Sequence, residues 1–206
     1  MKSEIVKVTS SGTGMSEALE MTEKAGDVAG LEKKEKLRLR LLAEELVGVM
    51  RGIAGDVEAD YCLTQEGKAF TLNLCADVTM TRDMREQLIA VSTSGENSAA
   101  AKGFMGKIKE MIAVALLPDE FGNSILSGLA LGFMSMESTG YQTGGETRIW
   151  TLHEYKQTVG ESRQGNAQAE EAWDELEKSI VASIADDVKV SVKGGHVEIA
   201  ISKAFE

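Results

Sequence analysis

Cysteine, histidine, proline and aromatic residues are all scarce in this chain of 206 residues. It has two cysteines, two histidines and one proline, and 5% of its residues are aromatic. Cys62 and Cys75 lack the CxxC spacing of a metal site, and His153 and His196 are far apart in the sequence. We therefore expect no metal ligands and no disulfide framework, and we expect both thiols to be buried and unreactive.

The chain also lacks a long apolar run and an excess of basic residues. No apolar stretch reaches the roughly 20 residues that a membrane-spanning helix needs, and the start has no signal-peptide pattern. The net charge of −11 gives no basic footprint for nucleic acid or for an anionic membrane. We expect a cytoplasmic protein that binds neither nucleic acid nor a membrane. A basic protein or a metal-chelated phosphate suits its negative charge better as a partner.

Apolar residues are plentiful enough for a globular protein, at 43% of the chain. A chain of this length can bury a single core. We expect residues 1–206 to form one domain, with additional hairpin and helix material in about residues 118–185.

Residues 36–55 carry apolar side chains at the i, i+3, i+4 and i+7 positions of a helix with one buried face. Glu44 and Glu45 stand in the middle of this pattern. Gly48 follows, although glycine costs about 1 kcal/mol relative to alanine in a helix. These residues indicate a role beyond packing. The alternative is an ordinary surface helix with a solvated pair of glutamates.

Residues 57–63 and 70–76 alternate between apolar and polar side chains and predict a β-hairpin. Pairing Gln65 with Lys68 at the turn places the apolar sets of both strands on one face. Asp77 ends the second strand on its polar face. A ligand contact is one role for it, and a simple turn or cap is the alternative.

A small, polar stretch at residues 92–101 leads into a helix predicted over residues 102–117. Because the stretch has almost no apolar side chain to bury, we expect it to be mobile without a ligand. Gly103 and Gly106 fall near the start of the helix, where exposed N–H groups favour an anion. The alternative is that these glycines allow tight packing and that the neighbouring lysines are solvated.

The remaining segments predict further elements by the same criteria. These are strands at 4–9, 131–136 and 147–153, helices at 15–28, 81–91 and 169–185, a polar linker at 160–168, and a final hairpin of 188–192 and 197–201 that turns at 193–196.

The order of these elements resembles the histidine-kinase-like ATPase superfamily, the GHKL or Bergerat-type ATPases. Within it, the chain looks most like the anti-sigma factor serine kinases, over roughly residues 4–117 and one terminal hairpin. The family motif on the acidic helix is Glu-x-x-x-Asn, whereas here Glu44 leads to Gly48 and Glu45 leads to Val49.

Two further motifs of the family have degenerate counterparts. The family strand ends in Asp-x-Gly-x-Gly, whereas this chain has Asp77-Val78-Thr79-Met80-Thr81. The glycine-rich box that follows the ATP lid corresponds to Lys102-Gly103-Phe104-Met105-Gly106. The resemblance implies an α+β fold, a two-layer sandwich in which helices cover one side of a mixed, mostly antiparallel sheet.

The resemblance also implies a mechanism. A helix Glu polarises the attacking water or hydroxyl, the Asn holds Mg²⁺, the Asp reads adenine, and the lid with its helix start neutralises phosphate charge. The implied catalytic candidates are Glu44 and Glu45. The implied contacts with ATP or ADP are Asp77, Ser94, Gly95, Asn97, Lys102, Gly103 and Gly106.

Because the Mg²⁺-binding Asn is missing, we expect kinase or ATPase activity to be weak or absent. Two functions stay open. The first is a nucleotide-binding regulatory protein that has a sigma factor or an anti-anti-sigma-like protein as partner and forms a homodimer. The second is a degenerate member that serves as a protein-interaction module without nucleotide.

Overall fold

The computed structural model describes residues 1–52, 57–78, 104–116, 142–144, 147–193 and 195–206. Several predictions fall outside these ranges and stay predictions. They concern the helix at 81–91, the polar stretch at 92–101, the strand at 131–136, and the candidate contacts Ser94, Gly95, Asn97, Lys102 and Gly103.

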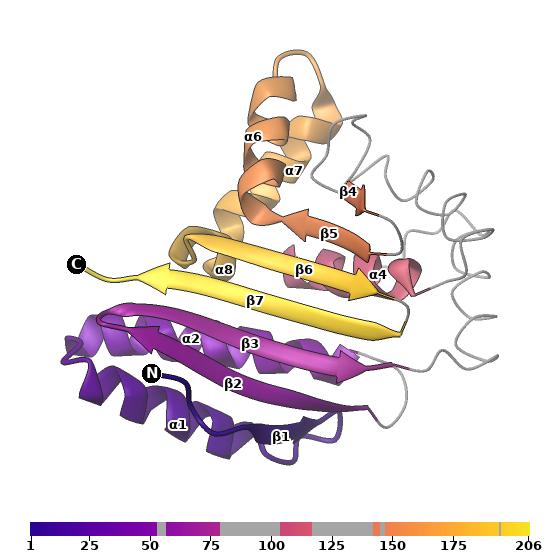
Figure 1. The fold of residues 1–206 in the computed structure, drawn as a ribbon. Helices are drawn as coiled ribbons and strands as arrows, with labels where there is room; N and C mark the ends of the chain where they lie inside the picture. The colour runs from indigo at the N-terminus through magenta and orange to yellow at the C-terminus, as the bar shows by residue number, and fades with distance from the viewer. Residues whose placement is uncertain (53–56, 79–103, 117–141, 145–146, 194) are drawn as a thin grey trace.

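The described strands form one seven-stranded sheet in the order β1-β2-β3-β7-β6-β5-β4 (Figure 1). The chain is therefore α+β, as predicted. Every described strand pair is antiparallel, so the expectation of a mixed sheet is wrong for these strands. The strands are β1 Val6–Thr9, β2 Glu58–Glu66, β3 Ala69–Asp77, β4 Gln142–Gly144, β5 Thr147–Thr151, β6 Asp187–Lys193 and β7 His196–Ala204.

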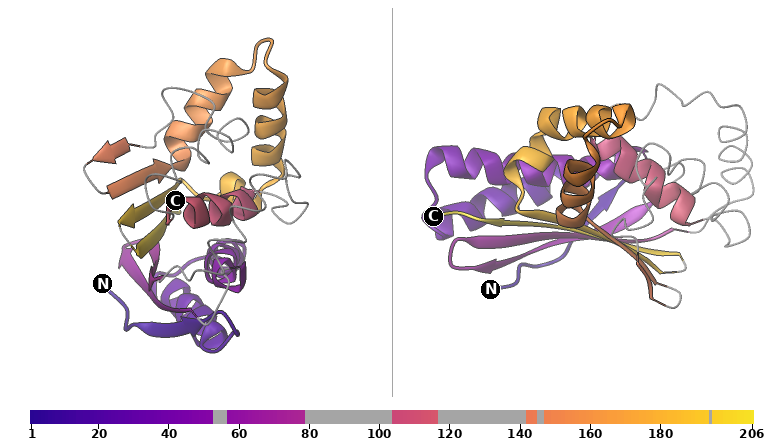
Figure 2. Two further views of the ribbon diagram at one scale, coloured as in Figure 1. Left: turned by 90° about the vertical axis from the view of Figure 1, so that its right-hand side faces the viewer. Right: turned by 90° about the horizontal axis from the view of Figure 1, so that it is seen from above.

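The described helices all lie on one face of the sheet (Figure 2). Side chains that point to this face are buried, and one row of them crosses five strands through Tyr61, Leu74, Ile199, Val190 and Trp150. The other face carries no described helix, and a row of polar side chains crosses it through Asp60, Cys75, Glu198 and Ser191. The core therefore lies between the sheet and the helices.

In the β2–β3 hairpin the apolar side chains of both strands lie on one face, as predicted, but the strands pair in a different register. Glu66 pairs with Ala69 across a two-residue turn that begins with Gly67, in place of the predicted pairing of Gln65 with Lys68. Gly67 has a φ of 58°, in the left-handed region that glycine adopts without strain. The register has moved by an even number of residues, so every side chain keeps its face, and alternation alone cannot detect the change.

Two long helices precede the hairpin. Helix α1 (Met15–Val28) has the predicted bounds, and α2 (Lys33–Gly48) begins earlier than predicted and continues into the short 3-10 helix η1 (Val49–Gly52). The carboxylate of Glu35 accepts a hydrogen bond from the Glu32 N–H at 2.7 Å, which fixes the start of α2. The buried stripe of α2 includes Leu39, Leu42 and Leu46, as the periodicity predicts.

Helix α4 (Phe104–Ala115) packs against η1 from the first half of the chain and against α8 (Ile180–Ile184) from the second half. The ring centroids of Phe104 and Trp150 of β5 are 6.0 Å apart, and those of Trp150 and Tyr155 are 5.7 Å apart. All three side chains are buried. Aromatic packing therefore holds α4 against the segment that contains β5.

That segment differs most from the prediction. Strand β5 ends at Thr151, whose Oγ1 accepts a hydrogen bond from the Glu154 N–H at 3.3 Å and caps α6 (Leu152–Ser162). His153, predicted at the end of a strand, lies in the first turn of α6. The predicted linker at 160–168 is helical at both ends. Thr151-x-x-Glu154 is a capping-box pattern, so the sequence did carry this signal.

The single helix predicted at 169–185 is two helices, α7 (Ala167–Lys178) and α8 (Ile180–Ile184). Ser179 separates them. Its Oγ accepts a hydrogen bond from the Ala182 N–H at 3.2 Å and starts a new helix. The apolar periodicity continues across this break, which is why it predicted one helix.

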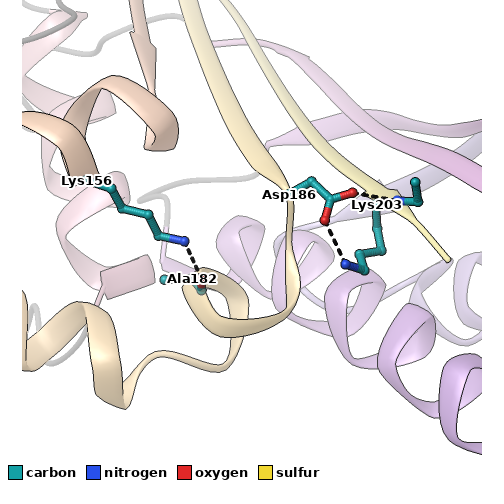
Figure 3. A network of polar contacts seen from close by, with 5 residues as sticks. Lys156, Ala182, Asp186 and Lys203 are labelled. Atoms are coloured by element: carbon teal, nitrogen blue, oxygen red, sulfur yellow. Dashed lines mark hydrogen bonds and ion pairs between the residues drawn. The ribbon is translucent and has the colours of Figure 1, made fainter. Parts of the chain in front are cut away.

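Polar contacts join α6 to α8 and hold the residue before β6 against β7 (Figure 3). The Lys156 ammonium donates to the Ala182 carbonyl at 2.6 Å, and burial lowers the pKa of Lys156. The Asp186 carboxylate accepts from Lys203 Nζ at 2.7 Å and from the Ala204 N–H at 2.6 Å. The terminal hairpin itself turns where predicted, since the residues at 193 and 196 are paired.

Candidate functional site

Glu44 and Glu45 lie in the C-terminal half of α2, but outside its buried stripe. Glu44 is exposed and Glu45 is half-buried, whereas Ala43 and Leu46 are fully buried. Our expectation that both acids interrupt the stripe is wrong, because each residue turns the helix by about 100° and carries these two away from the core. Glu44 therefore presents its carboxylate to solvent.

The residues one turn after the two acids differ in accessibility. A Cβ placed on Gly48 would meet no described residue within 4 Å apart from its own helix backbone and chain neighbours, whereas Val49 is fully buried. Glu44 and Gly48 thus share the exposed side of α2, while Glu45 leads to a core residue. Only the first pair can face a common ligand.

Asp77 is the last residue of β3, and its side chain is 89% exposed. Its Oδ1 lies 2.8 Å from Nδ1 of His196, the first residue of β7. The next residue, Val78, donates its N–H to the Gly195 carbonyl at 2.8 Å. The end of β3 is therefore held to the turn between β6 and β7. The sequence does not reveal this contact, because it depends on the pairing of β3 with β7.

Asp77 and α2 are on opposite sides of the sheet. The side chains of Ala76 and Val78, which flank Asp77, are buried on the face that the helices cover. Because successive side chains of a strand alternate, Asp77 points to the face without helices. The structure therefore does not bring Asp77 and Glu44 together across the helix-covered face.

Gly106 lies in the first turn of α4 and is half-buried. The neighbouring Phe104 is buried. The ammonium of Lys107 forms an ion pair with Glu175 of α7, and the Lys107 side chain is only 21% exposed, so Lys107 is not the solvated lysine that the packing alternative assumed. This end of α4 packs against other helices of the layer.

Cysteine and histidine form no metal site in the described part of the chain, where no group of three or more His, Cys, Asp or Glu side chains is placed to hold an ion. Cys62 and Cys75 are free thiols and are half-buried on the face without helices, where we had expected full burial. Partial burial and the nearby Glu198 carboxylate raise the pKa of the Cys75 thiol. The thiolate form that reacts with electrophiles is therefore disfavoured at Cys75.

Comparison of the chain with protein-family models, with curated proteins and with solved structures found no match. Among the helices that the structure describes, none has the length and apolar character needed to cross a bilayer. We therefore infer function from the geometry of α2, of the end of β3, and of the helix layer.

Proposed function

We propose that the protein is a regulatory protein that binds ATP or ADP on a Bergerat-type ATPase fold, like the anti-sigma factor kinases it resembles, with weak or no turnover. The observation that carries the proposal is the Glu44–Gly48 pair, one helical turn apart on the exposed side of α2 with open space over Gly48. An open sheet covered on one side by helices supports it (Figure 2).

Weak turnover follows from the residue at position 48. In the family the Asn at this place holds Mg²⁺, which neutralises charge on the transferred phosphoryl group. Gly48 has no side chain to offer. The residues present therefore suit nucleotide binding better than Mg²⁺-assisted phosphoryl transfer, with Glu44 left as the group that would orient a water or hydroxyl.

Asp77 would accept a hydrogen bond from the adenine amino group at the end of β3, where its side chain is 89% exposed. Its carboxylate is already held by His196 at 2.8 Å. Adenine binding therefore competes with this contact. Replacing His196 with Ala should strengthen the binding of ATP and ADP, and His153→Ala serves as a control because His153 lies in α6.

The first test is thermal unfolding with ATP, ADP or GTP at millimolar concentration, with and without Mg²⁺. A ligand at 100 times its Kd raises the free energy of unfolding by about 2.7 kcal/mol. Asp77→Ala should abolish the preference for adenine over guanine and leave the fold intact, whereas Asp174→Ala, at another exposed carboxylate, should change neither. If no nucleotide shifts the melting temperature of the wild type, the proposal fails.

A second test restores the family motif. Gly48→Asn should increase the effect of Mg²⁺ on ATP affinity, because it supplies the missing ligand next to Glu44. Gly48→Ala fills the same space without a metal ligand and is the matched control. Equal responses to Mg²⁺ in the two variants would show that Glu44 and Gly48 do not occupy the motif positions.

A second candidate is the interaction module without nucleotide, whose expected partner is a sigma factor or an anti-anti-sigma-like protein. It is favoured by Asp77, which faces away from α2 and already has a partner in His196. Under this function His196→Ala and Asp77→Ala should have equal, small effects on stability and none on nucleotide response.

A further inference from the structure

The side chain of Lys156, on α6, is half-buried and reaches the end of α8 (Figure 3). Its Nζ donates a hydrogen bond to the carbonyl of Ala182 at 2.6 Å, and Ala182 itself is buried. Ala182 belongs to the last turn of α8, where carbonyl groups have no partner within the helix. A lysine ammonium therefore satisfies a helix-end carbonyl in a partly desolvated place.

This ammonium differs from other half-buried lysines in having no carboxylate partner. Lys36, Lys107 and Lys203 are also half-buried, and each forms an ion pair with an Asp or a Glu. Within the described ranges Lys156 forms no ion pair. Its positive charge is thus partly removed from water without a negative charge in direct contact.

Two carboxylates act on Lys156 from a greater distance, and both are held by other groups. Asp186 pairs with Lys203, and Oδ1 of Asp187 accepts the backbone N–H of His153 at 3.0 Å. Burial lowers the pKa of Lys156 by more than these two charges raise it. At neutral pH a larger share of this amine is therefore neutral than in a fully solvated lysine.

We propose that Lys156 is an acylation site, at which the side-chain amine takes the acyl group of a small acyl phosphate. The neutral Nζ attacks the acyl carbon, and an N–C bond forms. The C–O bond to the phosphate breaks, and its electron pair leaves with the phosphate. The amine releases one proton to solvent, and nothing is oxidised or reduced.

The surroundings of Nζ favour a neutral product. An amide carries no charge, so acylation removes the cost of keeping an ammonium in this half-buried place. The carbamate that CO₂ forms with an amine would instead place a negative charge near Asp186 and Asp187, which repel it. Among modifications of a neutral amine, acylation therefore suits this site better than carbamate formation.

Acylation should weaken the contact between α6 and α8. The ammonium offers three donors and a positive charge, which the carbonyl end of a helix favours. The acylated side chain keeps one N–H and no charge. Because α8 also packs against α2 and α7, loss of this contact should lower the stability of the helix layer.

The first test is incubation of the full chain with acetyl phosphate near neutral pH, followed by mass spectrometry of the peptides that contain Lys156 and Lys189. Lys189 is exposed on the face without helices and is the internal reference. Lys156 should be acetylated at least about threefold faster, because the rate follows the neutral fraction of the amine. Equal or slower acetylation of Lys156 overturns the proposal.

A variant changes the reactivity without changing Lys156. Asp187→Asn removes a charge that stabilises the ammonium and keeps an oxygen for the His153 N–H, so acetylation of Lys156 should become about twofold faster or more. Asp174→Asn, at an exposed carboxylate of α7, is the matched control and should leave the rate unchanged. An unchanged rate in Asp187→Asn, in a variant that thermal unfolding shows to be folded, contradicts the proposal.

The effect on the helix layer is read from thermal unfolding before and after acetylation. The melting temperature of the wild type should fall, whereas Lys156→Arg should fall less, because arginine keeps a cation at α8 and is not acetylated. Lys189→Arg should behave like the wild type. Equal falls in the wild type and Lys156→Arg overturn the proposed effect of the modification. All of these measurements are made without nucleotide, so this proposal and nucleotide binding can fail separately.

Discussion

The hydroxyl groups of Thr22 and Tyr61 lie 2.7 Å apart in the core, where both side chains are fully buried. Thr22 donates to the Ala18 carbonyl at 2.8 Å, so the Tyr61 hydroxyl donates to Thr22 Oγ1. Burial raises the pKa of Tyr61 well above its usual value, which keeps the phenol protonated as a donor. This contact attaches α1 to the middle of β2.

Thr22→Val should lower the free energy of unfolding by about 1–3 kcal/mol, because it leaves the Tyr61 hydroxyl buried without an acceptor. Adding Tyr61→Phe removes the unsatisfied group and should recover part of the loss. Urea unfolding of the two single variants and the double variant measures the coupling. Strictly additive effects would contradict a direct hydrogen bond.

Two glycines should respond in opposite ways to substitution by alanine. Gly14 has a φ of 76°, and a Cβ there would lie 1.8 Å from the Lys7 carbonyl oxygen, so Gly14→Ala should destabilise the protein by more than about 1 kcal/mol. Gly48 has open space and no positive φ, so Gly48→Ala should stabilise α2 by about 0.5–1 kcal/mol. Thermal unfolding distinguishes the signs. A stabilising Gly14→Ala would rule out the close approach of the backbone to Lys7.

Asp186 should make stability depend on acid pH. Partial burial opposes ionisation, but hydrogen bonds from Lys203 and from the Ala204 N–H lower the net pKa of the carboxyl. The pKa of an unfolded Asp is about 3.9, so the unfolded state binds more protons just below that value. The stabilisation is therefore complete above about pH 5 and is lost as pH falls through the folded pKa.

The corresponding measurement compares the wild type with Asp186→Asn from neutral to acid pH. The difference in melting temperature should be present at neutral pH and shrink at the acid end. Lys203→Met removes the donor and should reduce the same pH dependence. A difference that stays constant down to the lowest pH at which the protein folds would assign Asp186 a role other than ion pairing.

Leu74 lies at the centre of the sheet, between Tyr61 of β2 and Ile199 of β7, and is 2% exposed. Leu74→Ala should cost about 2–5 kcal/mol, since the cavity cannot close against two flanking strands. Thr71→Ala on the other face of the same strand is the control and should cost less than about 1 kcal/mol. Comparable losses would mean that both faces are covered in solution.

Local patterns in the sequence determined much of the fold. The bounds of α1, the buried stripe of α2 and the facing of both hairpins follow from apolar periodicity, because burial of one face imposes that period on any helix or strand. The capping pattern at Thr151 is equally local. It indicates that a helix begins before His153, where alternation predicted a strand. The break at Ser179 was a harder case, because the apolar pattern continues through it.

The tertiary structure decided what periodicity cannot encode. A register change by two residues preserves alternation, so only the turn at Gly67 fixes the pairing of β2 with β3. The sequence assigned Asp77 to the polar face of its strand, but the placement of α2 on the opposite face depends on contacts between distant segments. For that reason the sequence could propose Glu44 and Asp77 as members of one site, while their separation by the sheet, and the pairing of Asp77 with His196, emerge only from the folded chain.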